Sequence, residues 1–105
     1  MADSQLRKGV LELVVLLSLE REPAYGGALL DRLKGEGLDV SSGTVYPLLT
    51  RLRKAGYIDA RWEESPVGPP RKVYDVTDDG RAAIARMTRE WRSLAAIVDA
   101  QLEGR

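Results

Sequence analysis

The sequence contains neither cysteine nor histidine in its 105 residues. The absence of cysteine excludes disulfide bonds, thiolate nucleophiles and every zinc site that needs a sulfur ligand. The absence of histidine excludes Ser-His and Cys-His nucleophiles, the facial iron triad and a histidine proton shuttle near neutral pH. Only carboxylate or lysine chemistry remains open to an enzyme of this composition, and we expect no metal and no cofactor.

The sequence also lacks an apolar stretch long enough to span a membrane. The longest one, Val10–Leu19, is interrupted by Glu12 and Ser18, whereas a transmembrane helix needs about 20 predominantly apolar residues. Charged residues follow at Glu20–Glu22, where a secretory signal peptide would carry a cleavage site flanked by small residues. We therefore expect a cytoplasmic protein without a membrane partner.

An excess of either charge is missing as well. Lysine and arginine together number 16, and so do aspartate and glutamate, which makes the formal net charge zero. The total charge therefore indicates no partner by itself. The length fits one domain, because domains cluster at about 100 to 150 residues.

Apolar residues at helical spacing predict two helices in the first third of the chain. The first ends at the charged cluster before Pro23, and the second runs from Ala24 to the stop signal at Lys34–Gly37. The apolar residues that define the first are Leu6, Val10, Leu13, Val14 and Leu17, and those that define the second are Tyr25, Leu29, Leu30 and Leu33.

A third helix is predicted after Ser41–Ser42, whose side chains can cap its first turn, and it ends at Gly56. Pro47 lies inside this segment, although proline fits a helix best in its first turn. We therefore expect the regular helix to start one or two residues later than Ser42. Its apolar face consists of Val45, Leu48, Leu49 and Leu52.

Two strands and a fourth helix complete the prediction. Tyr57–Trp62 and Arg71–Thr77 are rich in aromatic and β-branched residues, and the proline-rich segment Glu63–Pro70 separates them as the tip of a hairpin. Thr77 and Asp78 look like caps of a helix that runs to about Leu102.

This order of elements predicts a mainly α fold with a small β-hairpin, namely a winged helix-turn-helix followed by a long C-terminal helix. We place the winged helix-turn-helix in residues 1–77 and a dimerisation helix in residues 78–105, both within one compact unit.

The outer face of the third helix carries polar, aromatic and basic side chains that can donate to phosphates and base edges. Three cations, Arg51, Arg53 and Lys54, lie between Val40 and Ile58 without any acid. The hairpin adds Arg61, Arg71 and Lys72, but also acids at Glu63, Glu64 and Asp75. The pattern fits a DNA groove and its flanking backbone, while a merely solvated basic helix end is the alternative.

Three segments of the chain resemble the PadR family of bacterial transcriptional regulators. They are AYGGALLDRL at Ala24–Leu33, SGTVYPLLTRLRKAGYI at Ser42–Ile58 and RKVYDVTDDGR at Arg71–Arg81. The resemblance covers nearly the whole chain and looks like the short subclass with a single C-terminal helix. It implies a DNA-binding homodimer, usually a repressor, with the third helix in the major groove and the wing at the adjacent backbone.

Residue by residue, the resemblance implies a set of DNA contacts. Tyr25 resembles a family phosphate contact, although packing in the core is an equal alternative for this side chain. Gly27 stands where many relatives carry a larger residue. The implied contacts are Tyr25, Ser42, Thr44, Tyr46, Pro47, Thr50, Arg51, Lys54, Arg71 and Lys72.

The fourth helix predicts a seam for a partner helix. About 25 residues at 1.5 Å each give a rod of about 38 Å, longer than a compact domain of this size is wide, so part of the seam would be exposed in a monomer. We expect the first helix to join the interface. The predicted dimer interface comprises Leu6, Val10, Leu13, Ile84, Met87, Trp91, Leu94, Val98 and Leu102.

Trp91 lies near the middle of that seam. In some relatives aromatic residues at this place line a cavity between the protomers that admits flat hydrophobic ligands. Packing within the interface is the alternative, since tryptophan is enriched in interfaces generally. We favour packing for Trp91, and the resemblance leaves a small hydrophobic or aromatic effector as the second interpretation.

We therefore predict a sequence-specific regulator that binds double-stranded DNA at a pseudo-palindromic operator as a homodimer, with repression by operator occupancy. A winged-helix protein-interaction module that does not bind DNA is the alternative. An enzyme is disfavoured, because the best acidic cluster, Asp75, Asp78 and Asp79, has two members at a helix start and no nucleophile beside it.

Overall fold

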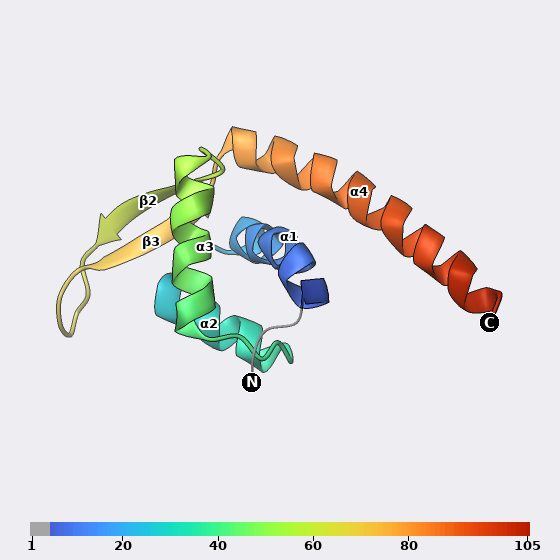
Figure 1. Ribbon diagram of the computed structural model, residues 1–105. Helices are drawn as coiled ribbons and strands as arrows, with labels where there is room; N and C mark the ends of the chain where they lie inside the picture. Colours follow the sequence, from blue (N-terminus) through green and yellow to red (C-terminus); the bar gives the residue numbers. More distant parts are fainter. Residues whose placement is uncertain (1–4) are drawn as a thin grey trace.

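The computed structural model describes residues 5–105, so the predicted domain 1–77 begins with four residues that lie outside the described part. The long final helix extends away from the body formed by the other elements (Figure 1). In chain order the elements are α1 (Gln5–Arg21), β1 (Ala24–Tyr25), α2 (Gly26–Gly35), α3 (Ser42–Lys54), β2 (Ile58–Glu63), β3 (Arg71–Val76) and α4 (Asp78–Glu103). The predicted winged helix-turn-helix with an added C-terminal helix is confirmed.

The core lies where α1, α2 and α3 meet the base of the sheet. All four residues predicted for the inner face of α3 are at most 3% exposed, so that face is confirmed. On α1 the core face differs from the stripe that defined the helix in the sequence, because α1 is apolar on several sides and periodicity cannot select one of them. The core residues of α1 and α2 are Leu11, Val15, Leu16, Leu19, Leu29 and Leu33.

The sheet has three strands in the order β1-β3-β2, all antiparallel. The predicted two-stranded hairpin was therefore incomplete, and Ala24 does not begin a helix. Instead Ala24 pairs with Tyr74 and Tyr25 with Val73. The free edge of β3 accepts this short extended segment after Pro23, and two residues are too few to show a strand period in the sequence.

The start of α3 departs from the prediction in two ways. The helix begins at Ser42 and keeps Pro47 inside it, so the later start that we expected is wrong. Ser41 is the N-cap, but its side chain makes no capping hydrogen bond. Its carbonyl oxygen instead accepts from the backbone N–H groups of Thr44 and Val45 at 3.1 and 3.0 Å. The helix is regular despite proline because Gly43, whose carbonyl loses its partner N–H, is exposed to water.

Arg32 of α2 holds the C-terminal end of α1. Its Nη1 donates to the Ser18 carbonyl and hydroxyl oxygens and to the Glu22 carbonyl oxygen, each at 3.0 Å. The Ser18 carbonyl also accepts from the Glu22 N–H at 3.2 Å, so Arg32 adds a second donor at the helix end, where a cation is also favoured by the helix dipole. The contact fixes the angle at which α2 leaves α1.

Thr77 joins the end of the wing to α3 and α4. Its hydroxyl oxygen accepts from the Gly80 N–H at 3.0 Å, which confirms the predicted cap, and donates to the Gly56 carbonyl at 2.6 Å. The Thr77 N–H donates to the Tyr57 carbonyl at 3.0 Å. Gly80 lies so close that a Cβ on it would sit 2.0 Å from the Tyr57 carbonyl oxygen. Only glycine therefore allows α4 to begin here.

We predict that Gly80→Ala destabilises the fold by about 2 kcal/mol or more, because backbone must shift to relieve the clash. For a domain of this size the melting temperature should fall by about 10 °C. The measurement is thermal unfolding followed by circular dichroism. Gly35→Ala is the matched control, since no heavy atom lies within 4 Å of its Cβ position. An unchanged melting temperature for Gly80→Ala, at the same protomer concentration, would contradict the prediction.

Candidate nucleic-acid interface

One stripe of α3 faces away from the core and carries the predicted DNA contacts. Figure 1 shows α3 standing between α1 on one side and the wing, formed by β2 and β3, on the other. Because the inner face is fully packed, the remaining side chains point outward along the helix. Ser42, Tyr46, Pro47, Thr50, Arg51 and Lys54 are exposed, and Thr44 is half-buried.

The stripe has one edge beside α1. Thr44, Pro47 and Arg51 follow one another at spacings of three and four, and they line a hollow of about 300 Å³ together with Lys8 and Glu12 of α1. The sequence analysis did not identify Lys8. A lone lysine on the first helix carries no signal of its own, because only packing brings α1 alongside α3.

The second edge lies beside the wing. Thr50, Arg53 and Lys54 of α3 line a hollow of about 280 Å³ with Lys72 and Tyr74 of β3 and the side of Leu49. Three cations, Arg53, Lys54 and Lys72, thus line the same hollow. Arg53 was counted among the cations of the segment but was not predicted as a DNA contact, and Tyr74 was missed as a site residue. The strand period of two, which puts Tyr74 on the same face as Lys72, was the available signal.

Tyr74 stays a neutral phenol in this setting. It is half-buried, and burial raises the pKa of its hydroxyl above the ordinary value of 10.0, while the nearby Arg53 guanidinium acts in the opposite direction. A neutral hydroxyl both donates and accepts hydrogen bonds. Tyr74 therefore adds a neutral donor among the cations of the second edge.

Tyr25 and Arg71 meet at the outer end of β1. The Arg71 guanidinium carbon lies 4.5 Å from the centroid of the Tyr25 ring, a cation–π contact. The Tyr25 ring is half-buried. Both residues also line a hollow of about 200 Å³ that reaches Tyr46 and Lys72. The two predicted contacts therefore share one place next to α3.

The wing carries a further aromatic residue beside a predicted contact. Lys72 lies directly opposite Trp62 in the register of β2 and β3, with its Nζ 5.5 Å from the ring centroid. Trp62 is 69% exposed, and the sequence analysis did not include it among the DNA contacts. Arg61, by contrast, pairs with Glu63 at 3.3 Å and Asp75 at 3.6 Å. Its charge is thus offset locally, which leaves Arg71 and Lys72 as the unbalanced cations of the wing.

The three acids considered for an enzyme site, Asp75, Asp78 and Asp79, have structural roles in the fold. Asp75 accepts from the N–H of Val76 at 2.9 Å as well as pairing with Arg61. Asp78 pairs with Arg81, and Asp78 and Asp79 lie in the first turn of α4, where negative charge is favoured by the helix dipole.

The residues predicted for a dimer interface differ in how far their own chain buries them. Ile84 is buried in the core of its own chain, while Val10, Leu13 and Met87 are half-buried between α1 and α4. Leu6 is 82% exposed. The C-terminal part of α4, which projects beyond the other elements in Figure 1, carries a stripe that is about half exposed and includes Ile97, missed in the sequence. The stripe is Trp91, Leu94, Ile97, Val98 and Leu102.

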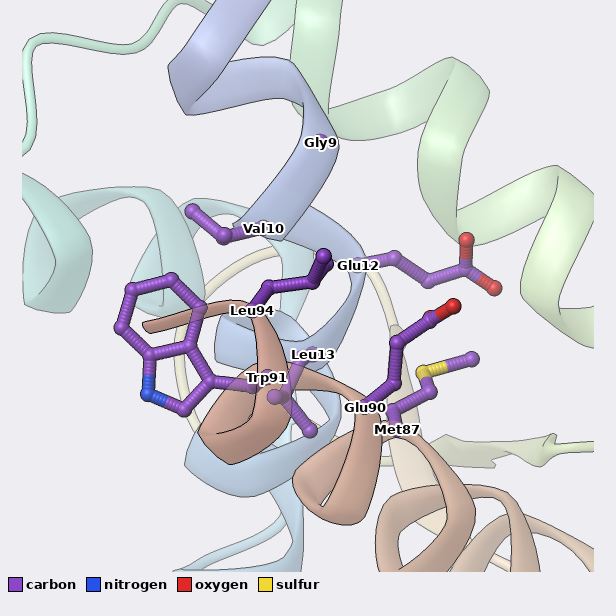
Figure 2. Close-up of a pocket in the computed structure, with 8 residues that line it drawn as sticks. All are labelled: Gly9, Val10, Glu12, Leu13, Met87, Glu90, Trp91 and Leu94. Carbon is purple, nitrogen blue, oxygen red and sulfur yellow. The ribbon is translucent and has the colours of Figure 1, made fainter. Parts of the chain in front are cut away.

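A hollow of about 140 Å³ lies between α1 and α4. Figure 2 shows the Trp91 ring toward one end of it and the carboxylates of Glu12 and Glu90 toward the other. Its remaining lining residues are Gly9, Val10, Leu13, Met87 and Leu94. Trp91, proposed in the sequence as either a ligand contact or an interface residue, therefore occupies a place that allows both.

None of the helices among residues 5–105 combines the length and the apolar character needed to cross a lipid bilayer.

Proteins of similar sequence and structure identify the family to which this arrangement of helices and strands belongs. A PadR family transcriptional regulator from Eggerthella lenta is 37% identical, with a TM-score of 0.88 over 96% of this chain and 88% of that one. A PadR-like transcriptional regulator from Bacillus cereus is 36% identical, with a TM-score of 0.87 over 97% and 100% of the two chains. A transcriptional regulator of Mycobacterium tuberculosis is 33% identical over 92 residues, which cover 87% of this chain and 84% of that protein. The sequence pattern of the transcriptional regulator PadR-like family matches residues 15–86, from α1 through the wing into α4, and the chain therefore belongs to this family of DNA-binding regulators.

Proposed function

We propose that the chain binds double-stranded DNA with α3 in the major groove and the wing against the adjacent backbone. The observation that carries this proposal is the exposed stripe of α3, which has cations along both of its edges. Arg51 and Lys8 lie along the α1 edge, and Arg53, Lys54 and Lys72 along the wing edge. The central hydroxyl and aromatic groups can read base edges, while the flanking cations neutralise phosphates.

The active species that we propose is a homodimer. The half-exposed stripe of α4 is apolar and lies on the part of the helix that projects beyond the other elements of the protomer, and a second copy of the same stripe would cover it. A two-fold axis would then present two α3 helices about one DNA turn apart, which suits a pseudo-palindromic operator. Occupancy of such an operator would repress transcription by excluding the polymerase. In this scheme residues 78–105 form the dimerisation helix, with the first two turns of α4 also packed in the core through Gly80, Ala83 and Ile84.

An effector would bind in the hollow between α1 and α4. Trp91 offers a flat ring, and Met87 and Leu94 offer apolar side chains that suit a small aromatic compound. Both helices that line this hollow also belong to the proposed dimer interface. A ligand bound there would therefore change the orientation of the two protomers relative to each other. Release from the operator would follow from that change.

We predict that Arg51→Ala combined with Lys54→Ala lowers DNA affinity by about 100-fold or more, because each dimer loses four cations beside the duplex. The double substitution should also reduce the slope of log Kd plotted against the logarithm of the salt concentration. The measurement is a fluorescence-anisotropy titration of the DNA upstream of the protein's own gene, over a range of salt. The dimer should stay intact in sedimentation velocity.

Lys34→Ala combined with Arg89→Ala is the matched control, since both residues are exposed and neither lines a hollow beside α3. It removes the same charge and should leave the affinity unchanged. If the control weakens binding as much as the test variant, bulk charge and not α3 is responsible. Retained wild-type affinity in the test variant would refute the recognition role of α3, and salt-independent or absent DNA binding by the wild type would favour a protein-interaction module.

For the dimer, we predict that Val98→Glu yields monomers at micromolar concentration, because two carboxylates would have to be buried in the seam. Val98 is 55% exposed within its own chain, so the protomer should still fold. Ala96→Glu is the control, since residue 96 lies on the opposite side of α4 from the stripe. Sedimentation velocity of the three proteins tests this. A wild-type monomer, or a Val98→Glu variant that stays dimeric, is inconsistent with the proposed seam.

For the effector, we predict that planar aromatic compounds such as naphthalene and acridine dyes quench Trp91 fluorescence. The chain has two tryptophans, so the titration uses Trp62→Phe, in which all tryptophan emission comes from Trp91. Quenching should saturate and should be accompanied by weaker DNA binding. The proposal fails if no compound quenches, or if Trp91→Phe, with only Trp62 left, is quenched equally.

A further inference from the structure

Gly26, the first residue of α2, lies against the ring of Tyr46 on α3. A Cβ atom on Gly26 would sit 2.5 Å from Cε1 of that ring, 2.8 Å from Cζ and 2.8 Å from the hydroxyl oxygen. Real Cβ atoms essentially never approach other heavy atoms this closely. The Tyr46 ring therefore occupies the space that any side chain at position 26 would need.

No backbone requirement explains glycine at this position. Among the described residues a positive φ occurs only at Gly37, Gly56 and Gly68, so Gly26 adopts a conformation that alanine adopts equally well. The contact with Tyr46 is thus the structural feature that disfavours a side chain at Gly26.

The neighbouring glycine provides a contrast. A Cβ on Gly27 would meet only the Tyr25 ring, at an ordinary van der Waals distance of 3.4 Å. The methyl group of an alanine therefore fits there without displacing anything. The two adjacent glycines of α2 therefore differ in the space beside them, because only at Gly26 does the Tyr46 ring occupy the place of a Cβ atom.

The Tyr46 ring has room to move aside if a side chain at position 26 occupies its present place. The side chain is 44% exposed, and its ring also borders the hollow that contains Tyr25, Arg71 and Lys72. A methyl group on Gly26 would push the ring outward into solvent instead of opening the core. The stability of the fold should change little, while the place of the Tyr46 hydroxyl on the α3 stripe should change substantially.

We propose that Gly26 is a positioning residue, which holds Tyr46 in the pose that contacts DNA and so makes the α2 N-terminus part of the recognition surface. This inference rests on the proposed DNA-binding function. According to this inference, the contact between α2 and α3 sets the orientation of the Tyr46 side chain in addition to packing the two helices together.

The test is a double-mutant cycle on DNA affinity with Gly26→Ala, Tyr46→Ala and their combination. Gly26→Ala alone should weaken binding by about tenfold, as does Tyr46→Ala, for a dimer that makes the contact twice. The double variant should bind no more weakly than Tyr46→Ala, since the alanine at position 26 then displaces nothing. Gly27→Ala is the matched control and should bind like the wild type.

Wild-type affinity for Gly26→Ala, or an equal further loss on adding it to Tyr46→Ala, would overturn the proposal. If Gly26→Ala fails to fold, the double variant decides, because removal of the ring should restore both folding and the affinity of Tyr46→Ala. A second readout is independent of DNA. The Hα protons of Gly26 should carry a ring-current shift in the NMR spectrum that disappears in Tyr46→Ala, so an absent shift refutes the contact even if the wild type binds no DNA.

Discussion

The hydrogen bonds of Thr77 constrain the relative placement of α3, the wing and α4, the elements that the proposed function assigns to DNA binding and dimerisation. Through one hydroxyl and one N–H, this residue ties together the turn after α3, the end of the wing and the first turn of α4. Gly80 allows the contact because its missing Cβ leaves room for the Tyr57 carbonyl. Because α3, the wing and α4 meet at one point, a change of angle in one of them can be transmitted to the others without an extra hinge.

The distribution of charge, not its total, favours DNA as a partner. The net charge is zero, yet cations line both edges of the α3 stripe, while the acids of the wing are partly neutralised by Arg61. Bulk attraction to a polyanion is therefore weak for such a chain. Affinity would depend on local contacts, and a dimer would double them, so specificity follows from the side chains of α3 and from their orientation.

The helix α1 borders both regions that the proposed function uses, the α3 stripe and the hollow beside Trp91. Its apolar core face holds the fold together, while Glu12 lines both the hollow next to α3 and the hollow next to Trp91. A shift of α1 would therefore be felt at both places, since packed helices move as units. The half-exposed stripe of α4 belongs to the same arrangement, because it continues directly from the second hollow.

Local patterns in the sequence determined much of this protein. The four helices, the hairpin, the cap at Thr77 and the two faces of α3 depend on residues within a few positions of one another, and each was predictable from spacing and side-chain type. Only the tertiary structure decided that β1 joins the sheet, that Leu11 and Val15 form the core face of α1, that Ile84 packs inside its own chain, and that Lys8, Tyr74 and Gly26 adjoin the α3 stripe. The physical reason is that a period or a cap is set within one or two turns, whereas the meeting of two faces depends on the packing of segments that are distant in the chain.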